Sequence, residues 1–499
     1  MKTKKLLSAL LVIFLLFGLT GCKKTEKIIT KTWVTDVEYE DVEVPNEPTE
    51  NVTDIKTGEQ NGSPEEVSKT SSGAVKRVKK KNPDLADNQN STSGPRVFYV
   101  SSSTGCDWDD GLSPETAFQS LAIACTKANR KGDYVLLKCG DIWRGEEIAC
   151  YTGVTYASYG EGKKPLLIGS PRNYSGKGLW KKYKGNIWVC SVSVPKDVGT
   201  IVFDNGKATA IKKMKSVDEL KKDFDFYHSW SEDKVYLYSI SDPSSRFSSI
   251  EFNYYITLIK LANGVVVDNL SMKYADYGCV GYGVANCTVK NCDFNYLGGC
   301  RHSTEKETRY GNAIEFYGNC QNIVAENNFI SQIYDTGFTC QYASDMTGDI
   351  IMKDILVKDN TIEYCHWSME YYITSENSTS KYKGYLANLT ISGNTFAHSG
   401  EGWSANQRST DNSTHFETFT WKDFTKSNIV IKNNIFEGCA GTLLYIGWTD
   451  FVPEFSGNRF AQYRGSFFMN LGGKLYSFDS GIEKFIKDLD ASAQILYLE

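Results

Sequence analysis

The C-terminal half of the chain repeats a short unit in which alternating apolar residues lead into a turn containing asparagine or glycine. Helical periodicity is absent between residues 255 and 470, so the repeated segments read as strands. The units step by 22, 36, 32, 34, 40 and 24 residues and begin at Val267, Val289, Ala325, Val357, Ile391, Ile431 and Phe455. A solenoid tolerates unequal steps when each turn keeps its core strands and places extra residues in loops. The pattern therefore predicts an all-β fold, a right-handed parallel β-helix.

One asparagine recurs at the same place in successive units, at Asn328, Asn360, Asn394, Asn434 and Asn458. Stacked strands lie about 4.8 Å apart, a distance at which amide side chains hydrogen-bond to their copies above and below. We therefore interpret this column as a structural ladder in the turns rather than as a set of ligands.

The segment before the repeats predicts a capped start to the solenoid. A strand at residues 98–101 is followed by Ser113 as N-cap and Pro114 at the first helical position, which favours a helix running to about Asn129. Such a helix would cover the open end of the coil, and residues 131–137 would form the first rung. Residues 170–250, rich in Trp, Tyr and Lys, interrupt the pattern and predict an inserted small β-module.

Residues 98–144, together with the asparagine-turn repeats, resemble the pectin-lyase-like β-helix superfamily. The resemblance covers roughly residues 96–480. That superfamily contains polysaccharide lyases and glycoside hydrolases, so the resemblance implies a carbohydrate-active protein without fixing the reaction.

The N-terminus predicts export and anchoring. Residues 1–22 combine early lysines, a short apolar run and the sequence Leu-Thr-Gly-Cys, which resembles a bacterial lipobox with Cys22 as the lipidated residue. Residues 23–95 hold few aromatics and many charged and small polar residues, which is typical of a flexible tether. We expect a lipid anchor at Cys22 on the extracytoplasmic face of the cell membrane, with residues 96–499 forming the β-helix domain.

Composition narrows the function further. A formal net charge of −5 offers no basic excess for phosphates, so nucleic acid is not an expected partner. A mean hydropathy of −0.37 excludes bulk membrane insertion. Besides Cys22, thirteen cysteines remain, without a zinc-type CxxC pair, and no disulfide can be assigned from their spacing. No metal or cofactor is predicted, and a monomer is expected.

Each repeat has a second strand that supplies candidate functional residues. In residues 312–316, alternation turns Ile314 and Phe316 inward and Glu315 outward. The same rule predicts an outward polar column that continues through Gln341, Glu370 and either Asn406 or Arg408. Long loops at residues 301–309, 343–349, 375–383 and 409–422 flank these strands and could wall a groove for a polymer.

Hydrolysis of a glycosidic bond requires two carboxyl groups, one as acid and one as base or nucleophile. Glu315 and Glu370 lie two predicted turns apart, about 9.6 Å along the coil, and side chains that lean together would reach the window of about 6.5–9.5 Å of an inverting pair. Asp335 and Glu401 are reserve carboxylates. The remaining candidates, for binding sugar or tuning the acid, are His302, His366, Arg309, Arg408, Tyr371 and Trp403.

Two other functions stay open at this stage. A polysaccharide lyase would use Arg408 or Arg309 as the base that removes the proton beside a uronate carboxylate. Calcium is expected only in that case, and no tight aspartate cluster supports it. Alternatively, the β-helix binds polysaccharide without cleaving it, as an adhesin would.

Overall fold

The computed structural model describes residues 94–499 apart from 345, 375–380, 411, 421–423 and 449. The predicted signal segment, Cys22 and the tether up to residue 93 lie outside the described residues. Residues 92–499 form one compact unit. No helix among the described residues is long and apolar enough to cross a membrane.

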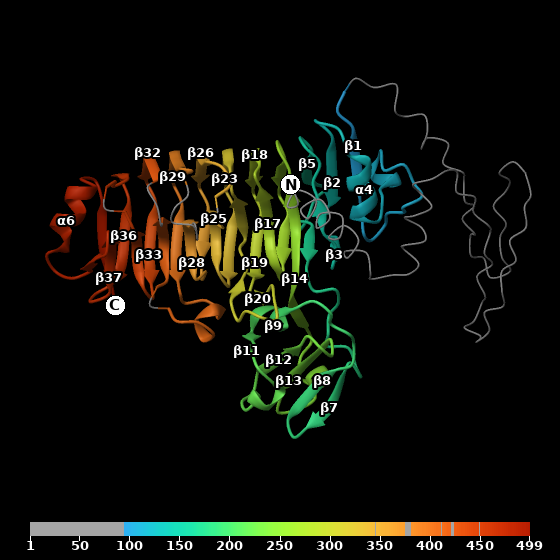
Figure 1. The fold of residues 1–499 in the computed structure, drawn as a ribbon. Coiled ribbons are helices and arrows are strands. Elements are labelled where there is room, and N and C mark those ends of the chain that lie inside the picture. The colour runs from blue at the N-terminus through green and yellow to red at the C-terminus, as the bar shows by residue number, and fades with distance from the viewer. Residues whose placement is uncertain (1–93, 345, 375–380, 411, 421–423, 449) are drawn as a thin grey trace, which may run out of the picture. The chain divides into compact units, whose positions relative to one another are not determined.

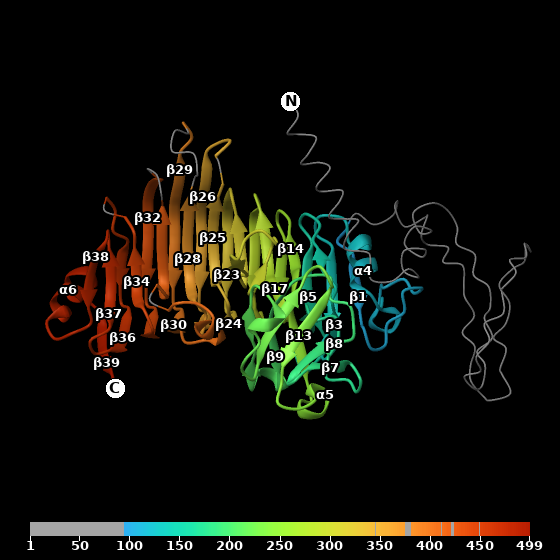
Figure 2. The same ribbon diagram turned by 60° about the horizontal axis from the view of Figure 1, so that its bottom comes forward.

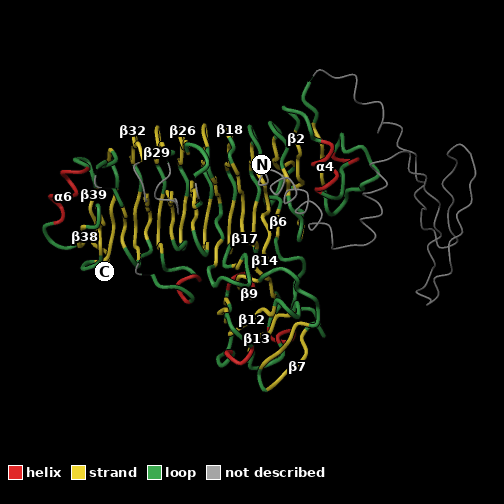
Figure 3. The backbone as a smooth tube through the Cα atoms, viewed as in Figure 1, coloured by secondary structure: helices red, strands yellow, loops and turns green. Residues whose placement is uncertain are grey.

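Three long sheets run along the coil, and successive strands of the chain visit them in turn (Figures 1 and 3). Sheet 1, parallel throughout, contains β1 (Val97–Val100), β2 (Tyr134–Lys138), β5 (Thr155–Tyr159), β15 (Val266–Asp268), β18 (Ala285–Lys290), β23 (Cys320–Glu326), β26 (Ile350–Lys358), β29 (Gly384–Ser392), β32 (Phe424–Lys432) and β35 (Glu454–Ser456). Sheet 2, also parallel, contains β3 (Ile142–Arg144), β6 (Leu166–Ile168), β16 (Ser271–Lys273), β19 (Asp293–Leu297), β24 (Phe329–Ile333), β27 (Thr361–Glu363), β30 (Thr395–Ser399), β33 (Ile435–Cys439), β36 (Arg459–Tyr463) and β39 (Gln494–Leu498).

Sheet 3 carries the candidate chemistry. It contains β4 (Ile148–Ala149), β9 (Val198–Phe203), β10 (Ala208–Thr209), β14 (Ile250–Leu261), β17 (Ala275–Tyr282), β22 (Ile314–Tyr317), β25 (Thr336–Ala343), β28 (Trp367–Thr374), β31 (Thr414–Thr420), β34 (Thr442–Ile446), β37 (Phe467–Leu471) and β38 (Lys474–Ser477). Its pairing is parallel from β14 to β37 and antiparallel only at the two ends, where β9 and β38 join. The predicted right-handed parallel β-helix is confirmed.

Inward-facing side chains fill the coil with aliphatic and aromatic layers. Phe396, Phe436 and Phe460 stack through the interior with ring centroids 5.1 and 5.4 Å apart. All thirteen cysteines of the described residues are free thiols, and ten of them are buried. Such thiols pack as small apolar groups, in accordance with the absence of any assignable disulfide in the sequence.

The asparagine ladder is confirmed as a structural device. In Asn394, the backbone N–H and Nδ2 both donate to Oδ1 of Asn434, at 2.9 and 3.0 Å, and Nδ2 also donates to the carbonyl of Val357. The same pattern links the other asparagines, and the last, Asn458, donates to Asp490 instead. Each buried amide therefore satisfies backbone groups of its own turn and of a neighbouring turn.

The predicted N-terminal helix is wrong in extent. Ser113 caps a short 3₁₀ helix, η1 (Pro114–Thr116), and a separate helix, α4, runs from Leu121 to Lys127. Between them Phe118 leaves helical geometry, because its N–H donates to Tyr99 and its carbonyl accepts from Ser101. Pairing with β1 therefore interrupts the helix. At the other end of the chain, α6 (Ile482–Leu489) precedes β39.

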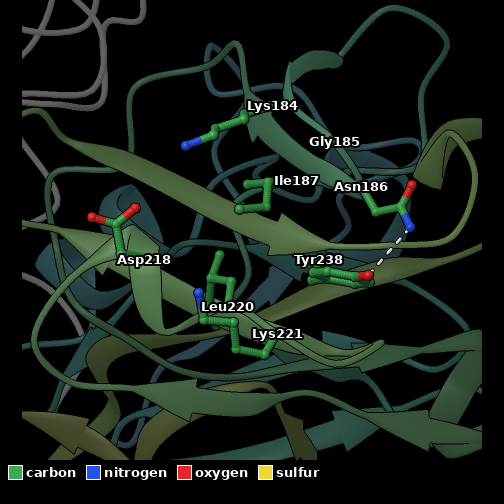
Figure 4. Close-up of a pocket in the computed structure, with 8 residues that line it drawn as sticks. All are labelled: Lys184, Gly185, Asn186, Ile187, Asp218, Leu220, Lys221 and Tyr238. Carbon is green, nitrogen blue, oxygen red and sulfur yellow. Dashed lines mark hydrogen bonds between the residues drawn. The ribbon is translucent and has the colours of Figure 1, made fainter.

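The insertion forms a small sheet beside the coil (Figures 1 and 2). Its strand order is β11 (Ile211–Lys213), β12 (Asp225–Ser229), β13 (Lys234–Tyr238), β8 (Ile187–Cys190) and β7 (Trp180–Lys184), with the short helices η2 (Asp204–Gly206), η3 (Val217–Glu219) and α5 (Pro243–Arg246). A pocket of about 360 Å³ lies at its edge (Figure 4) and includes Lys184, Lys221 and Asp218. In that pocket Asn186 donates to the hydroxyl of Tyr238 at 3.2 Å.

A buried carboxylate fixes this module to the coil. Asp197 forms ion pairs with Lys212 and with Nδ1 of His228, the latter at 3.1 Å, and accepts from the backbone N–H of Arg301 at 2.6 Å. Arg301 belongs to the hairpin of β20 (Cys300–Arg301) and β21 (Arg309–Tyr310). The side chains of Asp197, Lys212 and His228 are almost completely buried, so the group is structural.

Candidate active site

A column of in-register residues crosses the outward face of sheet 3. Glu315 pairs with Thr339, Thr339 with Glu370, and Glu370 with Glu417. Glu315 and Glu370 therefore lie two rungs apart on one sheet, as the alternation predicts. Gln341 lies on the rung between them, but Thr339 holds the position in register with the two glutamates. Gln341 pairs with Tyr317 and Tyr372 two positions further along, and its side chain hydrogen-bonds to Glu315.

Glu417 was not among the predicted site residues. The sequence pattern predicts the strand of this coil at residues 402–408, whereas the strand that carries Glu417 is β31 (Thr414–Thr420). Trp403–Asn406 is instead a 3₁₀ helix, η4, in an excursion before β31. Trp403 anchors the excursion, since its backbone N–H and Nε1 both donate to Gln332. The alternation Thr414, Phe416, Thr418 around Glu417 was the signal that marks the true strand.

A chain of hydrogen bonds joins the two predicted glutamates. Nδ2 of Asn312 donates to Oε2 of Glu315 at 2.8 Å, and Oδ1 of Asn312 accepts from the backbone N–H of Thr336 at 2.9 Å. The hydroxyls of Thr336 and Thr339 both donate to Oε2 of Glu370 at 3.2 Å. The Glu370 carboxyl therefore leans toward the start of β25, where Asp335 lies.

Asp335 is held by Arg408. Nη1 of Arg408 donates to Oδ1 of Asp335 at 2.8 Å and to the carbonyl of Tyr334 at 3.3 Å. The guanidinium also lies over the rings of Trp367 and Tyr334, 4.6 and 5.2 Å from their centroids. Arg408 is thus not on the strand column, where it was one of two expected residues, but its charge reaches the same cluster from the η4 excursion.

Burial raises the pKa of all four carboxyls of this cluster. The pKa of Glu370 lies well above its ordinary value, mainly through burial and further through the charges of Asp335 and Glu417. Burial and the charge of Asp335 raise the pKa of Glu417 to about 8. For Asp335, burial raises the pKa while Arg408 opposes the shift, and for Glu315 the hydrogen bonds from Asn312 and Gln341 oppose it. Neighbouring charges therefore act differently on these carboxyls: Arg408 opposes the upward shift of the pKa of Asp335, whereas Asp335 and Glu417 add to that of Glu370.

His302 borders the cluster and is oriented by a buried acid. Its Nε2 lies 2.9 Å from Oδ2 of Asp276, which is fully buried and also accepts from the N–H of Cys300. The imidazole stacks on Tyr255 at 4.7 Å and contacts Tyr310 at 4.5 Å. A positive charge on His302 lowers the pKa of both Glu315 and Asp335.

Four predicted binding residues do not present a free side chain to a substrate. Tyr371 is fully buried, because it alternates with the outward Glu370 and points into the core. Trp403, only 4 % exposed, packs on Tyr334. His366 is also buried, with Nε2 bonded to Asn412, and burial lowers its pKa to about 3 so that it stays neutral. Arg309 donates to the carbonyls of Gly299 and Gly199 and to Gln407, which ties the insertion to the coil.

The last two reserve positions also lie off the column. Asn406 is exposed on η4 rather than on a strand of sheet 3, because the chain makes its excursion there. Glu401 pairs with Nδ1 of His398 at 3.0 Å, outside the cluster. Across the described residues, no group of three or more His, Cys, Asp or Glu side chains is arranged to hold a metal ion.

Comparison with known proteins identifies similar folds at low sequence identity. No family model and no curated protein matches the chain. Among solved structures, a glycoside hydrolase is 10 % identical with a TM-score of 0.49, covering 80 % of this chain and 96 % of its own. XylC in complex with xylose is 12 % identical with a TM-score of 0.42, covering 76 % and 73 %. Pectate lyase Pel9A is 12 % identical with a TM-score of 0.30, covering 77 % and 74 %. The chain is a right-handed parallel β-helix protein, as the pairing of its three long sheets shows.

Proposed function

We propose that this protein is a glycoside hydrolase whose acid and base are Glu370 and Asp335. The observation that carries the proposal is the contrast between these two neighbouring carboxyls. Arg408 binds Asp335 and favours its ionised form, whereas Glu370 is buried beside two other acids and favours its protonated form. Two carboxyls with opposite protonation at the same pH are what glycosidic hydrolysis requires.

In this mechanism Glu370 protonates the oxygen of the leaving sugar as the glycosidic bond breaks. Asp335 then either removes a proton from the attacking water or attacks the anomeric carbon itself. Thr336 and Thr339 orient Glu370 through hydrogen bonds to Oε2. Glu315, held by Asn312, is the base of the alternative two-rung pair with Glu370, whose spacing suits inversion.

Elimination by a lyase is less well supported. It needs a base beside the uronate carboxylate, and the two arginines near the cluster already bind protein acceptors: Arg408 binds Asp335, and Arg309 binds two backbone carbonyls. A protein that only binds polysaccharide would not need four neighbouring carboxyls with raised pKa values, whereas such carboxyls are typical of catalytic sites.

The test is release of reducing sugar from a panel of polysaccharides and oligosaccharides. Asp335→Asn and Glu370→Gln should each lower kcat by at least about 1000-fold, because each removes a group needed in the transition state. Glu326→Gln, which alters a partly buried glutamate on sheet 1, is the matched control and should keep full activity. Glu315→Gln distinguishes the two possible catalytic pairs. This variant should lose activity if the base is Glu315 and keep it if the base is Asp335. Full activity in the Glu370→Gln protein would refute the proposal.

The lipid anchor at Cys22 is a separate proposal that rests on the sequence. A lipidated Cys22 would hold the β-helix at the extracytoplasmic face of the membrane, within reach of external glycans. Cys22→Ser should shift the protein from the membrane fraction to the soluble fraction. An unchanged membrane fraction would contradict the anchor.

A further inference from the structure

The charges around the candidate site are unevenly distributed. Asp276, Glu315, Asp335, Glu370 and Glu417 gather on or beside the outward face of sheet 3, and each of them except Asp276 belongs to the carboxyl cluster. The carboxyls raise one another's pKa, which means that the site already disfavours further negative charge.

The cations nearby are already engaged with protein acceptors. Arg408 binds Asp335 and lies over two aromatic rings, and Arg309 donates to Gly299, Gly199 and Gln407. His302 bonds to the buried Asp276. A sugar carboxylate or sulfate would therefore enter a site lined by acidic groups, without an arginine free to meet it in the bidentate geometry that anions prefer.

A tyrosine pair lies immediately beside the carboxyl column. Tyr282 and Tyr317 pair in register two residues beyond Val280 and Glu315, on the same outward face. Their ring centroids lie 5.7 Å apart, and Tyr282 is 68 % exposed. Ala343 donates to the Tyr317 hydroxyl at 3.1 Å, which fixes the inner ring of the pair. An exposed aromatic ring supported by a fixed neighbour is a surface on which the apolar face of a sugar ring can pack.

We propose that this site takes an uncharged glycan, and that the sugar next to the cleaved bond on the Glu315 side stacks on Tyr282 and Tyr317. The inference rests on the proposed hydrolase function and names its substrate class. Neutral sugars offer hydroxyls, which the carboxyls and Gln341 accept or donate to, and they add no charge to the cluster. Uronate polymers are excluded by the same argument.

The first experiment compares matched polymers on the Glu370→Gln protein, so that binding is measured without turnover. Polygalacturonate and its carboxyl-reduced form share one backbone, and a set of neutral plant and bacterial glycans completes the panel in affinity gel electrophoresis. At least one neutral polymer should retard the protein, and no uronate polymer should do so. Retardation by polygalacturonate equal to or stronger than that by every neutral polymer would overturn the proposal, as would retardation by none.

The second experiment tests the tyrosine pair in the active enzyme on the neutral polymer. Tyr282→Ala should raise KM roughly 2- to 13-fold and leave kcat within about twofold, because a ring contact of this kind contributes roughly 0.5–1.5 kcal/mol to binding. Tyr183→Ala, a tyrosine 52 % exposed on the insertion, is the control and should change neither constant. An unchanged KM in Tyr282→Ala would remove the platform. Tyr282-dependent binding of a neutral glycan without any hydrolysis would instead refute the hydrolase proposal and leave this one standing.

Discussion

Arg408 donates a hydrogen bond of 2.8 Å to Asp335 across 73 residues of sequence, and this contact sets the charge of the candidate site. The guanidinium arrives from the η4 excursion, while Asp335 ends the turn before β25. Two loops that are far apart in the chain thus meet over one rung of sheet 3. The residue that favours the ionised form of the proposed base therefore belongs to a different coil.

Removing this guanidinium should shift the acid limb of the pH–rate profile. Arg408 lowers the pKa of Asp335, so Arg408→Gln raises that pKa and the base becomes ionised only at higher pH. We expect the acid-side inflection of kcat/KM to move upward by about 1 pH unit or more, with activity at neutral pH falling at least about tenfold. Arg408→Lys keeps the positive charge but loses the planar guanidinium, so its acid-side inflection should lie between those of the parent and of Arg408→Gln. An unmoved acid limb in Arg408→Gln would separate Asp335 from the base.

Glu417 should control the alkaline limb. Its negative charge raises the pKa of Glu370, and its own pKa of about 8 places its ionisation at the upper end of the working range. Glu417→Gln removes that charge, so the pKa of Glu370 falls and the acid loses its proton at lower pH. The alkaline inflection of kcat should therefore move down by roughly 1 pH unit, with the maximal rate within about fivefold of the parent. Loss of all activity at every pH would instead assign the acid to Glu417 itself.

The parts of the site that lie on regular rungs were predictable from the sequence. Alternation around Glu315 and Glu370 fixed which residues face outward, and the strand pairings put both on one column. The period of two is a local property, so the pattern of a single strand is sufficient to set it. The register between neighbouring rungs depends on the lengths of the turns, which the pattern of one strand does not reveal. Gln341 was therefore predicted in register with Glu315 and Glu370, but it lies two positions further along its strand.

The parts that depend on excursions were not predictable. The segment from Trp403 to Arg408 has the composition of a strand, yet its backbone donors are satisfied by Gln332 and by 3₁₀ turns rather than by a neighbouring rung. The burial of Tyr371 follows from alternation, and its predicted binding role was therefore inconsistent with the pattern. His366 precedes β28 and is buried through its contact with Asn412, which the pattern of a single strand does not predict. Tertiary pairing also decided the broken N-terminal helix, because Phe118 bonds with β1.

The asparagine ladder should carry measurable stability. Asn394 is fully buried, and Asn394→Ala removes an amide that serves three backbone groups, leaving them unsatisfied in the turn. We expect a loss of about 2–4 kcal/mol in the free energy of unfolding from urea denaturation. Asn428→Gly is the control, since Asn428 bonds to Asn388 in an exposed ladder on sheet 1 and has a φ of 52° that glycine accepts without strain, and it should lose less than about 1 kcal/mol. Equal losses would show that burial of the amide is not what matters.

Substitution of the buried Asp197 should destabilise the contact between the insertion and the coil strongly. Lys212, whose pKa burial lowers while Asp197 raises it, has its side chain almost wholly enclosed, so Asp197→Asn leaves an ammonium without its counter-charge. Breaking a buried pair in this way costs about 3–5 kcal/mol. The double variant Asp197→Asn with Lys212→Met removes both charges and should recover part of that loss, measured by thermal and urea unfolding. The cluster of Glu315, Asp335 and Glu370 lies on the coil, so residual activity at low temperature should survive in the double variant. If Asp197→Asn alone is as stable as the parent, the ion pair does not hold the module, and the β9–β14 pairing and the contact of Arg309 with Gly199 hold it instead.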